Sequence, residues 1–161
     1  MNVTAAARRR REQAAARYQP VRVDTLLVSE APPSALDRYF YFEDVSIHDS
    51  LFRHVVQAVL GEKPTRDKAP YLDELRERGW FLLHMSEEPF QDRDVLPPLL
   101  PDLLVRCEEL QPRRIVVVGA RLFDLVRRPM REAGLPLVDV RLPYPGSGQQ
   151  RRFLDGMRLV V

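Results

Sequence analysis

A lone carboxylate follows the first buried apolar run of this chain. Residues 23–28 are mostly apolar and β-branched, and the next five residues read Ser-Glu-Ala-Pro-Pro, with Glu30 as the carboxylate. The run is typical of a parallel strand buried on both faces, and the two prolines then prevent both helix and further strand pairing. Because open α/β sheets bind ligands beyond the carboxyl ends of their strands, Glu30 is a candidate site residue. Alternatively, Glu30 only caps a helix or pairs with an arginine.

A glycine-rich stretch near the C-terminal end offers a different chemistry. Residues 145–148 read Pro-Gly-Ser-Gly and lie between the last apolar run and a short helix expected through Phe153. Free backbone N–H groups, a hydroxyl and the positive end of a helix together suit a phosphate group. The stretch contains neither a Walker A motif nor a G-x-G-x-x-G fingerprint, so an ordinary glycine-rich turn is the alternative.

Four aromatic residues, Tyr-Phe-Tyr-Phe, occupy positions 39–42. Neither helical nor strand periodicity turns four consecutive side chains to one side, so we expect some of these rings to be exposed or to line a cavity. Two uses are open. The rings form a stacking wall for a base or another flat ligand, or they belong to a loop that covers the core.

Cysteines and histidines argue against a metal centre. Cys107 is the only cysteine, which excludes an internal disulfide and a cysteine-built zinc or iron–sulfur site. The histidines His48, His54 and His84 are scattered and form no metal-binding motif. His84 lies near the end of a predicted strand, where one histidine alone is a weak indication of function. We therefore expect no metal and no cofactor.

Alternating apolar runs and breakers define the elements that must position these residues. Predicted strands alternate with predicted helices, so the economical fold is a three-layer α/β/α sandwich on a four-stranded parallel sheet. Pro129 is expected to kink or end its helix early. The predicted strands are 23–29, 80–85, 114–118 and 137–141. The predicted helices run from Asp49 or Ser50 to Gly61, from Pro70 to Gly79, from about Pro101 to Leu110, from about Arg121 onward, and through Phe153.

The length of 161 residues fits one α/β/α domain at 21–161, preceded by a basic helix or arm at 1–20. Net charge is +2, but residues 1–22 hold six arginines and one glutamate, or about +5, which leaves about −3 for the rest. A basic arm fits a polyanionic partner such as DNA, whereas the alternative is a solvated alanine-rich helix. With no membrane-spanning run and no secretory signal, a cytoplasmic monomer is expected.

The motifs at residues 29–33 and 144–147, SEAPP and YPGS, resemble those of the uracil-DNA glycosylase superfamily. Members of that superfamily carry a motif such as GEAPG or GQDPY after strand one and a second motif, typically HPS, after the last strand. The similarity runs from about residue 23 to residue 153. Tyr144 stands where most families carry histidine, and residues 84–86 replace an asparagine that many families use to read uracil. The four cysteines of the iron–sulfur families are missing.

The resemblance implies a DNA glycosylase that hydrolyses the N-glycosidic bond of a flipped damaged base, uracil or a related deaminated base, in lesion-containing DNA. Glu30 would stabilise the oxocarbenium-like sugar or orient water, and Tyr144, Ser147 or His84 would donate a hydrogen bond to the departing base. Two alternatives are open: a nucleic-acid or nucleotide-binding module on the same fold without hydrolysis, and an unrelated α/β enzyme for a nucleotide-like small molecule. The implied base-binding residues are Ala31, Tyr39, Phe40, Tyr41, Phe42, His84 and Ser86. The implied phosphate-binding residues are Pro32, Pro33, Pro145, Gly146, Ser147, Gly148 and Gln149.

Overall fold

A parallel sheet of buried strands forms the centre of the molecule. The computed structural model describes residues 3–44, 49–65 and 67–161, so His48 lies outside the described residues. The central strand is β1, which pairs in parallel with β2 on one side and β3 on the other. Nearly every strand residue is buried, as the continuous apolar runs predicted. The strands are β1 (Thr25–Ser29), β2 (Trp80–His84) and β3 (Arg114–Val117).

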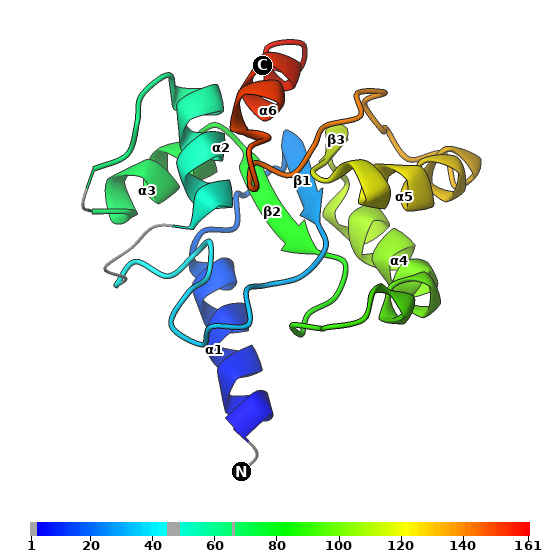
Figure 1. The fold of residues 1–161 in the computed structure, drawn as a ribbon, viewed down its shortest axis with the longest axis horizontal. Coiled ribbons are helices and arrows are strands. Elements are labelled where there is room, and N and C mark those ends of the chain that lie inside the picture. Colours follow the sequence, from blue (N-terminus) through cyan, green and yellow to red (C-terminus); the bar gives the residue numbers. More distant parts are fainter. Residues whose placement is uncertain (1–2, 45–48, 66) are drawn as a thin grey trace.

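Helices cover both faces of this sheet, with α2, α3 and α6 on one side and α4 and α5 on the other (Figure 1). Right-handed crossovers explain this division, because the chain moves from β1 to one neighbouring strand and then back across β1 to the other. The mixed α/β architecture with a parallel sheet is confirmed. The helices are α1 (Val3–Arg17), α2 (Ser50–Leu60), α3 (Ala69–Glu77), α4 (Leu100–Leu110), α5 (Ala120–Glu132) and α6 (Gln150–Met157). Short 3₁₀ helices are η1 (Arg93–Val95) and η2 (Pro97–Leu99).

The fourth predicted strand, 137–141, does not form a regular strand. The segment lies beside β3 and, within the described residues, pairs with it at two isolated parallel bridges, Ile115–Leu137 and Val118–Leu142. Between these bridges the N–H of Val140 donates to the Val138 carbonyl at 2.9 Å. Because this N–H bonds back to its own segment, it is not free to extend a continuous ladder with β3. A four-stranded sheet is therefore not confirmed.

The predicted helices form close to their expected bounds. α2 begins after Asp49, whose side chain accepts a hydrogen bond from the N–H of Phe52 at 2.6 Å, and it ends at Gly61 with φ of 77°. In α5, Pro129 does not end the helix, which continues to Glu132. Proline removes one helical hydrogen bond, but a buried stripe extends past it and holds the last turn in place. That stripe consists of Leu122, Phe123, Val126 and Met130.

The basic N-terminal segment is a helix, α1, that packs on the domain through arginine side chains. Arg11 is 7% exposed and donates to the carbonyl of Glu87 at 2.8 Å. Carboxylates of the domain therefore already hold three arginines of this segment. The ion pairs are Arg8–Glu87, Arg11–Glu88 and Arg17–Glu43. Neither α1 nor any other helix in the described part of the chain is long and apolar enough to cross a membrane.

Candidate functional site

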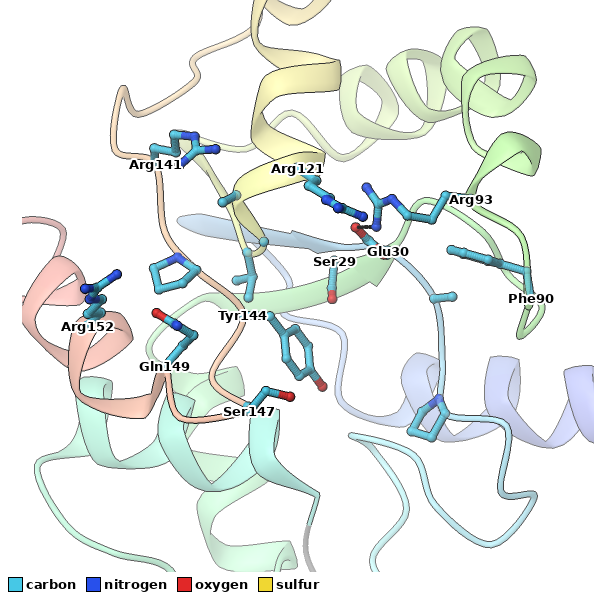
Figure 2. Close-up of a pocket in the computed structure, with 17 residues that line it drawn as sticks. Ser29, Glu30, Phe90, Arg93, Arg121, Arg141, Tyr144, Ser147, Gln149 and Arg152 are labelled. Atoms are coloured by element: carbon cyan, nitrogen blue, oxygen red, sulfur yellow. Dashed lines mark hydrogen bonds and ion pairs between the residues drawn. The ribbon is translucent and has the colours of Figure 1, made fainter.

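A cavity of about 880 Å³ opens at the carboxyl edge of the sheet (Figure 2). Its walls come from the ends of β1 and β3, the loop after β2, the start of α5 and the segment before α6. Parallel strands bring these loops together at one edge, where α/β folds bind ligands. Ligand pockets commonly measure about 300–1,000 Å³, so a nucleotide-sized ligand fits here. The predicted site residues that line the cavity are Glu30, Ala31, Pro33, Tyr144, Gly146, Ser147 and Gln149.

Glu30 is the first residue after β1 and reaches the cavity from the sheet edge. Its carbonyl accepts a hydrogen bond from the N–H of Ser86 at 2.8 Å, and the two prolines that follow limit the backbone on the other side. The carboxylate is partly exposed and accepts a hydrogen bond from Arg93 in an ion pair. A carboxylate fixed in this way can face a developing cation or orient a water molecule.

Tyr144 enters the same cavity from the segment before α6 (Figure 2). The residue is 43% exposed, yet burial of its hydroxyl end, with the charges of Asp49 and Glu30, raises its pKa to about 12. The hydroxyl therefore stays protonated at neutral pH and can donate a hydrogen bond. Gly146 packs on the ring, since a Cβ at this position would lie 3.3 Å from Cδ1 of Tyr144.

The rest of the predicted phosphate-binding loop is only partly directed at the cavity. Ser147 has a left-handed φ of 51° and lines the cavity together with Gln149. Pro145 is buried, and its carbonyl accepts a hydrogen bond from the hydroxyl of Ser50 at the start of α2. Pro145 and Gly148 do not line the cavity, whereas their neighbours Gly146, Ser147 and Gln149 do.

The aromatic stretch at 39–42 does not line the cavity. Only 3–8% of each of the four residues is exposed, so the expectation of exposed rings is wrong, whereas Tyr39 lines a smaller cavity of about 130 Å³. The chain makes a turn closed by the N–H of Phe42 and the Tyr39 carbonyl at 3.1 Å, so the rings leave it in different directions. They pack on one another and on Phe52 and Phe81. The placement favours a loop that covers the core rather than a base-stacking wall.

Three other predicted site residues also lie outside the main cavity. His84 is buried, and within the described residues both its ring nitrogens lack hydrogen-bond partners. Burial, assisted by two neighbouring arginines, lowers its pKa to about 3. His84 and Pro32 line a smaller cavity of about 130 Å³ between α1 and the end of β2. The Ser86 hydroxyl donates to the carbonyl of Glu88 at 2.6 Å and so stabilises its own turn.

Sequence reasoning missed a ring and four arginines of the cavity. They come from loops and helix starts that carry no motif, although a compositional signal existed. Residues 113–161 contain ten arginines and four acidic residues, and three of the four missed arginines belong to this part. The missed side chains are Phe90, Arg93, Arg121, Arg141 and Arg152 (Figure 2).

The cavity thus combines a fixed carboxylate, a neutral phenol, a ring and several guanidinium groups. Rings bind flat apolar groups, and guanidinium groups bind phosphates or carboxylates. A ligand with a flat part and an anionic part, such as a nucleotide, suits this set. Comparisons with protein-family models, with curated proteins and with solved structures found no match for the chain.

Proposed function

We propose that the protein is a DNA N-glycosylase of the uracil-DNA glycosylase type, acting on a flipped damaged base such as uracil or a related deaminated base. The observation that supports it most is that Glu30 and Tyr144, from the two resembling motifs, line one cavity. The proposal includes a glycosylase-like fold, in which segment 137–142 is the fourth strand of the sheet. We also propose that the protein binds lesion-containing DNA, is a monomer and is located in the cytoplasm.

In the proposed reaction, water attacks C1′ of the flipped nucleotide. The C1′–O bond forms, the N-glycosidic bond breaks, and its electron pair leaves with the base, while the proton lost by water passes to solvent. Glu30 stabilises the oxocarbenium-like sugar and orients the water. The departing base gathers negative charge and accepts hydrogen bonds from the hydroxyls of Tyr144 and Ser147. One such donor can contribute about 3 kcal/mol to the transition state.

Phe90 takes the stacking role in this proposal. Within the described residues, the aromatic side chains that line the cavity are Phe90 and Tyr144. Phe90 is partly buried in the loop after β2, and its ring points into the cavity from the side of Glu30 on which Arg93 lies (Figure 2). A flipped base stacked on Phe90 would therefore hold its glycosidic bond near the carboxylate.

Base release from a panel of lesion-containing oligonucleotides tests the proposal. The wild-type protein should release at least one deaminated base. Glu30→Gln keeps the shape and removes the charge, so it should slow release roughly 100-fold while folding and DNA binding stay nearly intact. Glu77→Gln, exposed on α3, is the matched control and should leave the rate unchanged. Equal rates for wild type and Glu30→Gln would mean that Glu30 is structural.

A nucleic-acid-binding module without hydrolysis is the second candidate. The Glu30–Arg93 ion pair favours it, because a carboxylate that already faces a guanidinium group stabilises a second cation less. Tyr144 in place of the usual histidine favours it too. Under this alternative, DNA binds and no lesion in the panel is released. Tyr144→His should then restore release if the donor to the departing base is what is missing.

A further inference from the structure

Two guanidinium groups meet beside one carboxylate in the cavity. The side chains of Arg93 and Arg121 point toward one another next to Glu30 (Figure 2). Arg93 is paired with Glu30, whereas Arg121 has neither an ion pair nor a side-chain hydrogen bond within the described part of the chain. Two like charges with one counter-charge leave excess positive charge, which a second anion would neutralise.

The start of α5 adds to this positive charge. Arg121 is the second residue of α5, whose N-cap, Gly119, provides no side-chain hydrogen bond, and the first turn contains no acidic residue. A cation at this end of a helix opposes the helix dipole and is mildly destabilising. Real proteins depart from such local rules mainly at functional sites. Both Gly119 and Arg121 line the cavity.

A hydroxyl at the end of β1 offers a further hydrogen-bonding group to a ligand in the cavity. Ser29 is 2% exposed, and within the described residues its hydroxyl has no hydrogen-bond partner. Ser29 lines the cavity, and its oxygen points into it (Figure 2). In the described residues the fully buried polar side-chain atoms without a partner are the ring nitrogens of His84, so the Ser29 oxygen is open to the cavity, where it can hydrogen-bond a ligand oxygen.

We infer that Arg93, Arg121 and the start of α5 form a subsite for a phosphate group. The identity of the ligand rests on the proposed function: the phosphate belongs to the flipped nucleotide or to its neighbour, and the base lies toward Phe90. A phosphate held by both guanidinium groups draws hydrogen bonds of Arg93 away from Glu30. Substrate binding thereby frees the carboxylate that the empty site keeps paired.

Inorganic phosphate is the probe for this subsite, titrated calorimetrically at constant ionic strength against chloride. Arg121→Gln should bind it about tenfold more weakly than wild type, the usual scale for losing a charged hydrogen-bond donor. Ser29→Ala should lower the affinity a few-fold. Arg128→Gln is the matched control, because Arg128 lies on the same helix, has a side chain that is 87% exposed and pairs with Glu132.

Absence of phosphate binding by the wild type, or equal affinities for Arg121→Gln and Arg128→Gln, overturns the inference. Deoxyribose 5-phosphate, a monoester, and an oligothymidine without terminal phosphates, which holds only diesters, separate the two sources of phosphate. A loss of affinity for either one in Arg121→Gln supports the subsite, and the larger loss identifies the source. Failure of base release would contradict the glycosylase proposal and leave phosphate affinity unchanged, so the two failures are distinguishable.

Discussion

The buried imidazole of His84 destabilises the folded state, because its polar ring makes no hydrogen bond within the described residues. A neutral imidazole carries one donor and one acceptor, and both ring nitrogens of His84 are buried without partners among the described residues. Protonation of the ring would destabilise the folded state further, because burial and the charges of Arg11 and Arg106 disfavour the imidazolium ion. The pKa of His84 therefore lies at about 3 in the folded protein, against about 6.5 when unfolded.

This pKa shift predicts that the free energy of unfolding decreases as pH falls from neutral to 3. The unfolded chain binds the proton more readily, so the full stability is present above pH 6.5 and is lost as pH falls toward 3. At pH 5 the loss should be about 2 kcal/mol. His84→Leu removes both the titration and the unpaired nitrogens, so it should flatten the change in urea midpoint between pH 7.5 and pH 5. An equally steep change in the variant would contradict this account.

Among the elements, α1 contacts the loop after β2, a contact that the sequence did not predict. Arg8 and Arg11 hold Glu87 and Glu88 in the loop after β2, and the same loop carries Phe90 into the main cavity. The helix is strongly polar, so these arginine contacts contribute much of what keeps it docked. α1 therefore helps to position the cavity wall, whatever else its arginines bind.

Arg11→Gln should loosen this loop. The substitution leaves the carbonyl of Glu87 and the carboxylate of Glu88 without their buried donor, at a cost of about 1–3 kcal/mol in the free energy of unfolding. Backbone amides at 86–92 should exchange hydrogen faster, while those of α2 stay protected. Arg22→Gln, at an exposed site before β1, should change neither region. Unaltered exchange at 86–92 in Arg11→Gln would show that α1 does not hold the loop.

The turn between α3 and β2 depends on a glycine for two reasons that a pair of variants can separate. Gly79 has φ of 80°, and a Cβ there would lie 2.8 Å from Cβ of Asp24, whereas Gly61 has φ of 77° and open space around it. Gly61→Ala should therefore cost about 1 kcal/mol for the backbone alone, and Gly79→Ala at least about 2 kcal/mol. Urea denaturation measures both, and equal losses would refute the predicted clash.

On the scale of the whole molecule, charge is divided along the chain. Residues 1–22 carry about +5, residues 23–112 carry nine more negative than positive charges, and residues 113–161 carry six more positive than negative ones. The basic C-terminal part supplies the starts of α5 and α6, from which Arg121 and Arg152 line the cavity (Figure 2). The acidic middle part holds the arginines of α1. A polyanion should therefore approach from the α5–α6 side.

DNA affinity should depend on salt chiefly through that side. Replacing Arg151 and Arg152 by Gln should flatten the slope of log K against log salt by about 0.9 per lost contact for duplex and about 0.7 for single strands. Deleting residues 1–17 should also weaken binding and lower the slope, but less per arginine, because several of these arginines already pair with glutamates. Fluorescence anisotropy over a salt series measures both, and an unchanged slope after the deletion would mean that α1 makes no phosphate contact.

Local chemistry made several features predictable from the sequence alone. Buried parallel strands need continuous apolar runs, and caps and breakers act within a few residues, so the three strands and the capped α2 form where expected. The prolines after Glu30 and the glycines after Tyr144 likewise set the backbone locally. Parallel pairing then brings both residues to one edge, and they line the same cavity.

Tertiary structure alone decided the remaining features, because each depends on residues far apart in the sequence. The four rings at 39–42 are buried because a turn spreads them and distant rings surround them. Segment 137–141 bonds partly to itself instead of forming a full ladder with β3. Arg8 and Arg11 of α1 form ion pairs with glutamates of a loop that is distant in the sequence. Arg93 and Arg121 belong to separate elements and point toward one another. Burial and charge pairing depend on which elements pack together in the folded protein, so no short stretch of sequence determines them.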